Sequence, residues 1–315
     1  MCIRDSCGTF AIDDAVLFAL EEFLPAAPAH NAIYLEAIRA FRESLPGIPL
    51  VAAFETEFHT TVPACAHLYG VPAEWRAEGV RKYGFHGASH QYVAERSAAL
   101  LGRQTRLVSC HLGGSSSMCA IERGRSIDTT MGFSPQSGLE NATRHGDLDA
   151  FAVLFMMEHH GWTCGQVREQ LATGGGLAGL SGIEGGDVRD LEQAAAAGHA
   201  DAATAIRVFV YQVKKTIGAY AAAMGGLDAV AFTGGIGENS ASLRADCCSC
   251  LLYTSTRMRT SASFSCCTPT PRARSTGCWT RPRRRRRRAI SPTSTARAIH
   301  SGRSRTLAAS RKSGN

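Results

Sequence analysis

The stretch Arg81-Lys82-Tyr83-Gly84-Phe85-His86-Gly87-Ala88-Ser89-His90 decides how this chain is interpreted. It places two histidines four positions apart, with a glycine on each side of the Phe85-His86 pair and two basic residues before them. Glycine beside a polar side chain indicates that the backbone bends or that a ligand comes close. Because a histidine can donate its N–H to an anion without adding a full charge, we interpret the stretch first as an anion site.

Two other roles for these histidines stay open. His86 and His90 have the spacing of two metal ligands on one helical face, but no glutamate lies between them and no third ligand follows at a usual interval. We therefore predict no metal ligands here. Either histidine could instead be a structural, hydrogen-bonded residue, and this alternative weighs more for His90 than for His86.

Length and composition favour a two-domain protein in the cytoplasm. A chain of 315 residues can bury a large core and exceeds the usual size of one domain. No apolar run is long enough to span a bilayer and no signal peptide opens the sequence, so we expect no membrane association. The 12 cysteines lack the spacing of a disulfide framework, and reduced thiols are the simpler interpretation.

Charge divides the chain unevenly. Residues 246–315 hold 16 of the 34 lysines and arginines, with a block from Arg283 to Arg288, and their one acid is Asp246. This segment is therefore +15, against −8 for residues 1–245. One interpretation is a disordered basic arm that binds nucleic acid through phosphates. We favour a non-native tail, such as out-of-frame translation, because the change follows a well-formed glycine loop directly.

Before the histidine stretch, apolar spacing predicts two helices and a strand. Helical periodicity runs from Asp13 to Leu24 and from Ala32 to Leu45. Residues 48–54 then predict a short buried strand, which ends at Glu55-Thr56-Glu57-Phe58-His59. Polar residues at the end of a buried strand are well placed to line a cleft.

After the histidine stretch, two strands each lead into a glycine-rich loop. A helix from Gln91 to Leu101 precedes the strand Arg106–Cys110 and the loop His111-Leu112-Gly113-Gly114-Ser115-Ser116-Ser117. The second strand, Asp228–Thr233, opens into Gly234-Gly235-Ile236-Gly237-Glu238-Asn239. Such loops can wrap backbone N–H groups around phosphate oxygens. Neither is a P-loop, because no Gly-Lys-Ser/Thr follows.

Between these loops, Arg144 lies in Thr143-Arg144-His145-Gly146-Asp147, outside any periodic element. An arginine among small and polar residues is a candidate for bidentate binding of phosphate or carboxylate, with a surface salt bridge as the alternative. Residues 150–159 predict a buried helix, and residues 202–224 predict a long amphipathic one. Glycine spacing within residues 174–179 matches a dinucleotide fingerprint, but a helical pattern precedes it, so we reject the match.

The combination of these features suits phosphoryl transfer. Such catalysis mostly needs two anionic reactants held in line and cationic donors spread over the moving phosphoryl group. His86 and Arg144 suit the donor role, Glu55 supplies a carboxylate at a strand end, and the two glycine loops suit phosphate binding.

Residues 10–245 resemble the acetate kinase family. The run from Tyr83 to His90 is close to the family signature Tyr-Gly-Phe-His-Gly-Thr-Ser-His, and further motifs follow in the same order. The resemblance implies an α/β fold, namely the actin-like, ribonuclease H-like two-domain fold of the acetate and sugar kinase, Hsp70 and actin superfamily, with an incomplete first domain. We expect a leader at 1–7, an N-terminal domain remnant at 8–60, a nucleotide-binding C-terminal domain at 61–245 and a disordered basic tail at 246–315.

The resemblance also implies an activity and its partners. The family transfers a phosphoryl group reversibly from ATP to acetate with Mg²⁺, giving acetyl phosphate and ADP. Expected partners are ATP or ADP, a short-chain carboxylate or acyl phosphate and, for the intact parent, a second subunit in a homodimer, with no specific nucleic acid. The alternatives are a propionate or butyrate kinase and a non-catalytic, actin-like nucleotide-binding module.

Individual roles follow from the same resemblance. It implies that His86 and Arg144 stabilise the transition state, and that Glu55, where the family usually has Asp, is an acid/base or orients Mg²⁺ and its water. His90 matches the second histidine of the signature, and Gly114 replaces a usual Asn. The implied phosphate and nucleotide contacts are His111, Leu112, Gly113, Gly114, Ser115, Asp187, Val188, Arg189, Gly235, Ile236, Gly237, Glu238 and Asn239.

Some parts of the family pattern have no counterpart in this sequence. They are an opening strand with a Gly-Ser-Ser-Ser loop, the arginine that holds the substrate carboxylate, and a late segment with a magnesium-binding glutamate. We therefore expect this chain to be a weakly active or inactive fragment.

Overall fold

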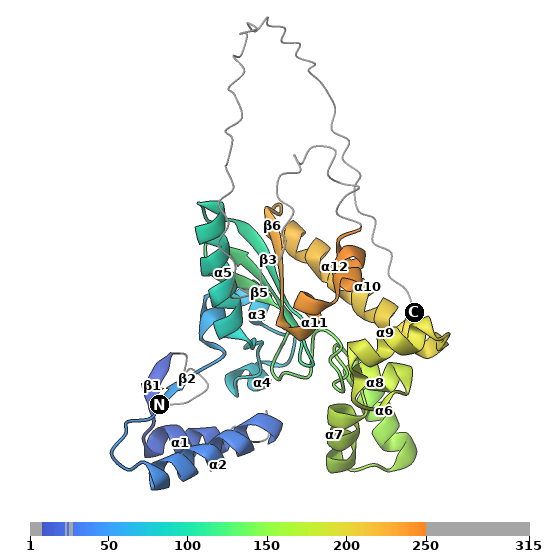
Figure 1. The fold of residues 1–315 in the computed structure, drawn as a ribbon. Helices are drawn as coiled ribbons and strands as arrows, with labels where there is room; N and C mark the ends of the chain where they lie inside the picture. Colours follow the sequence, from blue (N-terminus) through green and yellow to red (C-terminus); the bar gives the residue numbers. More distant parts are fainter. Residues whose placement is uncertain (1–7, 23, 25–27, 250–315) are drawn as a thin grey trace, which may run out of the picture. The chain divides into compact units, whose positions relative to one another are not determined.

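The computed structural model describes residues 8–22, 24 and 28–249 (Figure 1). The expected leader and residues 250–315 of the expected tail lie outside these described residues. Within the described part the chain is mixed α/β, as the sequence predicts. Among these residues no helix is both long and apolar enough to cross a membrane.

The first described segment contains two short strands and two helices. β1 (Thr9–Ala11) pairs antiparallel with β2 (Val51–Ala53), and α1 (Asp14–Glu22) packs against α2 (Pro28–Ser44). β1 was not predicted, whereas the two helices and β2 lie where the apolar spacing predicts them. The prediction that this strand is buried is wrong, because β2 pairs only with β1 in a two-stranded sheet and Val51 is 59% exposed.

A four-stranded mixed sheet in the order β5-β4-β3-β6 organises the residues that follow. β3 (Arg106–His111) pairs antiparallel with β4 (Ser117–Glu122), and β4 pairs antiparallel with β5 (Arg125–Thr129). On its other side β3 pairs in parallel with β6 (Ala229–Thr233). The strands predicted at 106–110 and 228–233 are confirmed, and their parallel pairing brings their two C-terminal loops to one edge.

Two helices cover opposite faces of this sheet (Figure 1). On one face α5 (Gly87–Leu101) packs Val93 and Ala94 against Leu107 and Ile121. On the other face lies α10 (Ala200–Ala223), which carries the predicted apolar stripe. The buried residues of that stripe include Phe209, Val213, Ile217 and Tyr220. Each fully buried apolar side chain contributes about 1.5–3 kcal/mol to folding.

Shorter helices form the connections between these elements. They are η2 (Glu57–Thr61), α3 (Ala64–His67), α4 (Ala73–Ala77), α6 (Ala150–His160), α7 (Cys164–Thr173), α8 (Gly176–Ser181), η3 (Glu184–Gly186), α9 (Val188–Ala196), α11 (Gly234–Asn239) and α12 (Ala241–Cys248).

Three of these helices differ from what the sequence predicts. No residue of α6 is buried and Phe151 is 77% exposed, so the predicted buried helix is an exposed apolar one. The glycine loop expected after β6 forms the short helix α11. The domain boundary expected at residue 246 falls inside α12, which continues to Cys248.

Candidate functional site

The α5 face of the central sheet changes from apolar to polar along β3. In the β3–β4 register Leu107 lies opposite Ile121, whereas His111 lies opposite Ser117. Alternate residues of a strand share a face, so Ser109 and His111 continue the face that Leu107 begins. The apolar end packs against α5, and the polar end adjoins the loop that follows β3.

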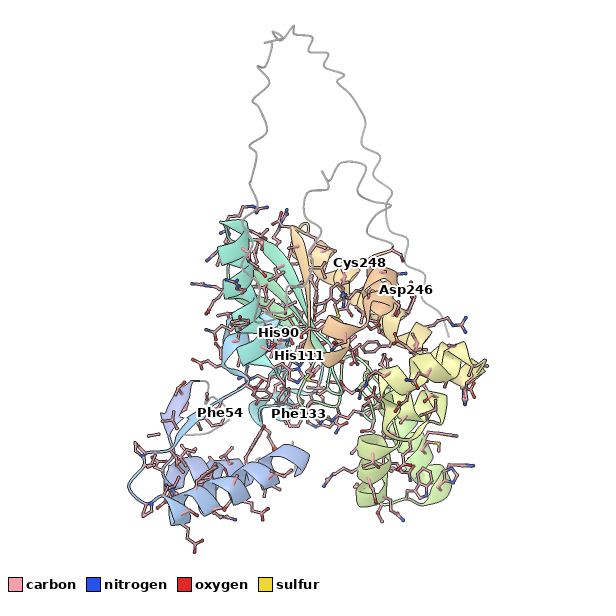
Figure 2. The ribbon with its side chains drawn as sticks, viewed as in Figure 1. Phe54, His90, His111, Phe133, Asp246 and Cys248 are labelled. Atoms are coloured by element: carbon pink, nitrogen blue, oxygen red, sulfur yellow. The ribbon has the colours of Figure 1, made fainter. Side chains whose placement is uncertain are left out.

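Four imidazoles gather at this polar end. They come from η2 (His59), from the start of α5 (His86 and His90) and from the end of β3 (His111), and Figure 2 labels two of them, His90 and His111. The rings of His86 and His111 stack with their centroids 4.3 Å apart. The ring of His90 lies edge-on to those of His59 and His111, at 5.7 and 6.4 Å.

Serine hydroxyls contact every one of these rings. Ser117 and Ser109 are both fully buried and lie on either side of His90. The nitrogen-to-oxygen distances are 2.9 Å for His59 Nδ1 to Ser126, 2.8 Å for His86 Nδ1 to Ser117, 2.9 Å for His90 Nδ1 to Ser109, 2.9 Å for His90 Nε2 to Ser117 and 2.9 Å for His111 Nδ1 to Ser89.

His86 occupies an uncommon backbone conformation at the N-terminus of α5. Its φ is 58°, in the left-handed region, and Gly84 before it has a φ of 79°. Non-glycine residues held there store strain, and such positions cluster at functional sites. The bend that the flanking glycines predict is therefore present, and it sets the imidazole at the positive end of a 15-residue helix.

Glu55 lies beside His86 because Gly87 permits a close approach. A Cβ on Gly87 would overlap the carbonyl oxygen of Glu55, which accepts the Gly87 N–H at 2.9 Å. Burial raises the pKa of the Glu55 carboxyl, and hydrogen bonds from the backbone N–H groups of His86 and Gly87 oppose that rise. The structure thus brings Glu55 and His86 together.

Arg144 reaches the same loop that contacts His86. Its Nη1 donates to Ser115 Oγ at 3.0 Å, and Ser115 is two residues before Ser117, the partner of His86. Burial lowers the pKa of this guanidinium. Residues 113–117 therefore connect Arg144 with His86.

The backbone around Arg144 is held by a buried asparagine that the sequence did not reveal. Asn141 is 1% exposed, its N–H donates to the Arg144 carbonyl at 3.0 Å, and its Oδ1 accepts the Ser116 N–H at 2.5 Å. Gly176, with a φ of 62°, packs against the backbone of Asn141 and Arg144. The glycine-rich segment that mimicked a dinucleotide fingerprint thus supports the arginine loop.

The two predicted glycine loops are hydrogen-bonded to each other. The Leu112 carbonyl accepts the N–H groups of Ile236 and Gly237 at 2.9 and 3.0 Å, and the Leu112 N–H donates to Thr233 at 2.8 Å. Leu112 is fully buried, and its N–H and C=O are both used in these hydrogen bonds, so it joins the two loops rather than facing a ligand. Burial lowers the pKa of His111, and the charge of nearby Glu238 opposes this shift.

The predicted Asp187-Val188-Arg189 motif lies at the start of α9. Asp187 is the N-cap residue, and its carboxylate accepts the Arg189 N–H at 2.9 Å and pairs with the Arg189 guanidinium at 2.6 Å. Val188 is 4% exposed, so its side chain belongs to the core. Gly186 packs against the carbonyl of Ala142, which places this helix start next to the arginine loop.

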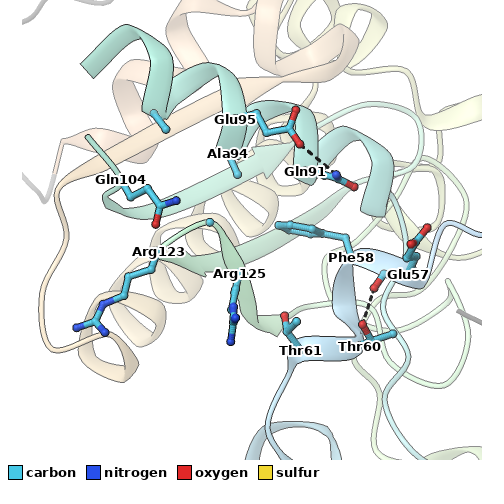
Figure 3. Close-up of a pocket in the computed structure, with 12 residues that line it drawn as sticks. Glu57, Phe58, Thr60, Thr61, Gln91, Ala94, Glu95, Gln104, Arg123 and Arg125 are labelled. Atoms are coloured by element: carbon cyan, nitrogen blue, oxygen red, sulfur yellow. Dashed lines mark hydrogen bonds between the residues drawn. The ribbon is translucent and has the colours of Figure 1, made fainter. Parts of the chain in front are cut away.

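A separate pocket lies on the η2 side of α5 (Figure 3). It has a volume of about 580 Å³, and Phe58, Glu95, Arg123 and Arg125 are among the residues that line it. None of the predicted site residues lines this pocket. We therefore place the candidate site at the histidine and arginine cluster.

The described residues offer a magnesium ion a single carboxylate ligand rather than a complete set of protein ligands. No group of three or more His, Cys, Asp or Glu side chains in the described part could hold a metal ion. Mg²⁺, however, usually takes only one or two protein carboxylates together with phosphate oxygens and waters. The carboxylate of Glu55 beside His86 meets that smaller requirement.

Comparison with known sequences gives a consistent family. The profile of the Acetokinase family matches residues 7–265. An acetate kinase of Heliobacterium modesticaldum is 46% identical over 251 residues, which cover 78% of this chain and 63% of that protein. One of Geobacillus kaustophilus is 50% identical over 238 residues, covering 74% and 60%. The chain thus spans about three fifths of the length of these curated relatives.

Solved structures give the same result for the fold. An acetate kinase of Porphyromonas gingivalis aligns with a TM-score of 0.72 at 37% identity, over 79% of this chain and 63% of that one. A propionate kinase of Francisella tularensis subsp. tularensis SCHU S4 aligns with a TM-score of 0.76 at 36% identity, over 80% and 65%. The predicted class, an α/β fold of the actin-like kinase type, is confirmed.

Proposed function

Since this chain belongs to the acetokinase family, we propose that it carries the phosphoryl-transfer site of a carboxylate kinase, which converts ATP and acetate reversibly to ADP and acetyl phosphate. The observation that carries the proposal is that His86 and Arg144 both contact residues 115–117 of one loop. A moving phosphoryl group needs hydrogen-bond donors on several of its oxygens, and an imidazole and a guanidinium supply them.

In this proposal each part of the site has one task. Arg144 donates to the equatorial oxygens of the phosphoryl group, and His86 donates an imidazole N–H to the same group. Of the loop at His111, Gly113, Gly114 and Ser115, the residues Gly114 and Ser115 would offer backbone N–H groups to phosphates, as small residues after a strand can, whereas the Gly113 N–H already donates to Ser116 Oγ at 3.1 Å. Because Arg144 is half-buried, its charge acts in a medium that screens it less than water does.

The nucleotide is assigned to the loops next to the arginine. Residues 235–239 contact the adenosine and residues 187–189 contact the nucleotide, in agreement with their positions beside residues 112 and 142. Asp187 and Arg189 already pair with each other, so a bound nucleotide competes with that pair or stacks on it.

Glu55 would hold Mg²⁺ together with the nucleotide phosphates. When bound, the ion would neutralise charge on the phosphate oxygens. The alternative task for Glu55 is that of an acid or base at the acceptor carboxylate, and the upward shift of its pKa by burial is in the direction that this task needs. Either task needs the carboxyl group where the His86-Gly87 backbone keeps it.

An assay for acetyl phosphate tests the proposal. The purified chain would be given acetate, ATP and Mg²⁺, and acyl phosphate would be trapped as the hydroxamate while nucleotide binding is followed by calorimetry. We expect Arg144→Ala to lower turnover by about 10³-fold, as the loss of a transition-state arginine does. Arg103→Ala, which removes an exposed arginine paired with Asp228, is the matched control and should leave turnover unchanged.

Each result of that assay has a meaning. Turnover in the chain that survives Arg144→Ala would contradict the assigned role of Arg144. Because this chain is expected to be weakly active or inactive, nucleotide binding with little or no acyl phosphate would agree with that expectation. The same result in a parent that carries the missing family segments would favour a non-catalytic, actin-like nucleotide-binding module, and binding of neither substrate would refute the proposal for this chain.

Propionate and butyrate remain the alternative acceptors. A propionate kinase is among the similar structures, with a TM-score of 0.76. The ratio of kcat/KM for acetate, propionate and butyrate decides the question, and a preference for propionate would make this chain a propionate kinase.

We further propose a homodimer with α6 in the contact surface. This helix has no buried residue, and Phe151, Leu154 and Phe155 are 77%, 49% and 61% exposed. A contiguous apolar face of this kind usually marks an interaction surface. A second copy of the chain is the expected occupant.

We also assign the protein to the cytoplasm. The six described cysteines, at 65, 110, 119, 164, 247 and 248, are all free thiols. Free thiols are typical of a reducing compartment, and ATP as substrate agrees with it.

A further inference from the structure

A buried serine hydroxyl joins two histidines of the candidate site. Ser117 Oγ lies 2.8 Å from His86 Nδ1 and 2.9 Å from His90 Nε2. A hydroxyl has one proton, so it donates to one ring and accepts from the other. If Ser117 donates its proton to His86 Nδ1, that nitrogen is unprotonated and a neutral His86 carries its proton on Nε2. If Ser117 donates to His90 instead, His86 Nδ1 must carry the proton.

His90 enters this series as a neutral ring. It is fully buried, and burial lowers its pKa well below the ordinary value of 6.5, with the nearby imidazoles of His59, His86 and His111 adding to the shift. A neutral imidazole carries its proton on one nitrogen and accepts with the other. His90 therefore donates to only one of its two serine partners.

Ser109, at the far end of the series, determines the direction of donation. Its hydroxyl is fully buried, and His90 Nδ1 at 2.9 Å is its only hydrogen-bond partner among the described residues. If His90 Nδ1 carried the proton, the Ser109 proton would be buried without an acceptor, at a cost of about 1–3 kcal/mol. The favoured order is donation from Ser109 to His90, from His90 Nε2 to Ser117, and from Ser117 to His86 Nδ1.

We propose that His90, Ser117 and Ser109 are positioning residues that hold His86 as the neutral tautomer with its proton on Nε2. The edge of the ring away from Ser117 is then a hydrogen-bond donor. Stacking supports the neutral form, because His111 lies 4.3 Å from His86 and two cationic rings would repel each other. The use of that N–H on a phosphoryl oxygen rests on the proposed function of His86.

Nitrogen NMR of the full chain, labelled with ¹⁵N-histidine, tests the proposal without requiring turnover. Spectra would be recorded at about pH 8, above the ordinary histidine pKa, and the His86 signals assigned by their loss in His86→Gln. We expect a protonated Nε2 and an unprotonated Nδ1 at His86. A proton on Nδ1 of His86 would overturn the proposal directly.

Two variants separate positioning from mere packing. Ser117→Ala removes the bridging hydroxyl, so His86 should change to a mixture of tautomers. His90→Gln places an amide N–H near the position of Nε2, so the Nε2–H form of His86 should persist. An unchanged His86 spectrum in Ser117→Ala would also overturn the proposal, and thermal melts would show that each variant is folded.

The outcome is distinguishable from that of the proposed function. If the chain turns over, Ser117→Ala should lower kcat by about tenfold with little change in the KM for ATP, since only donor orientation is lost. A chain with the expected tautomer but no turnover would refute the kinase activity of this chain and leave the hydrogen-bond order standing.

Discussion

At the scale of single residues, a buried neutral imidazole couples the stability of this chain to pH. His59 is 4% exposed, its Nε2 donates to the Phe85 carbonyl at 3.0 Å and its Nδ1 accepts from Ser126 at 2.9 Å. Burial lowers the pKa of His59 from 6.5 to about 4. Between these two pKa values the unfolded chain binds a proton at His59 that the folded chain does not. The free energy of unfolding therefore falls as pH falls through this window, and the contribution of His59 is fully present above pH 6.5.

We therefore expect wild-type chain to lose about 2 kcal/mol of unfolding free energy at His59 between pH 7 and pH 5. Urea unfolding at both pH values would measure it. His59→Gln should show a smaller drop than wild type by about that amount, whereas His160→Asn, at an exposed histidine, should show the wild-type drop. Equal pH dependence in wild type and His59→Gln would contradict this assignment.

Residue types and spacing foretold part of the site. His86 and Arg144 were predicted from glycine flanks and from an arginine outside any periodic element, and the structure brings both to residues 115–117. Ser117 and Asn141 could not be predicted, because a serine in a small-residue run and a lone asparagine carry no pattern. The partners of their side chains are 25 or more residues away, and only the folded chain brings them together.

At the scale of elements, the start of α5 depends on the missing side chain of Gly87. A Cβ at this position would overlap the Glu55 carbonyl oxygen and lie 3.2 Å from the Phe58 side chain. We expect Gly87→Ala to lower the free energy of unfolding by about 1–3 kcal/mol, because backbone atoms must move apart.

Gly218 offers the matched control for that change. It lies inside α10, and a Cβ added there would meet nothing within 4 Å, so Gly218→Ala should be neutral or stabilise the chain by up to about 1 kcal/mol. Denaturant midpoints of the two variants and wild type provide the measurement. Equal midpoints for Gly87→Ala and Gly218→Ala would show that the close approach to Glu55 is not required.

Periodicity predicted the long elements well and a hairpin not at all. The 3.6-residue repeat gave α10 to within two residues, and the β3 and β6 strands were recognised from short apolar runs. The β4–β5 hairpin was missed because Arg123 stands in its turn with a φ of 51°, before Gly124 at 75°. Both φ angles suit a tight two-residue hairpin turn, in which Asn or Asp normally stands at the first position. Arg123 stands there instead, so the Asn-Gly or Asp-Gly pair that marks such a turn in a sequence is absent. The exposure of α6 was not predicted, because an apolar run in a sequence does not show whether another part of the protein packs against it.

At the scale of the whole molecule, the exposed apolar helix α6 should decide the assembly state. Phe155 is 61% exposed on α6, and Tyr211 is 64% exposed on α10. If α6 joins two copies, Phe155→Glu should convert a dimer to a monomer, because a buried unpaired charge is costly. Light scattering after gel filtration measures the mass, and Tyr211→Glu is the control that should remain dimeric. A dimer that survives Phe155→Glu would place the contact elsewhere.

The position of β6 in the sheet has a practical consequence. Among the described strands β6 pairs only with β3, so its other side presents backbone N–H and C=O groups along Ala229–Thr233. This segment, Ala-Val-Ala-Phe-Thr, contains no charge and no proline, the two devices that commonly keep an open strand from recruiting another chain. We therefore expect concentrated solutions of this polypeptide to self-associate through this edge, so storage conditions need as much care as the assays.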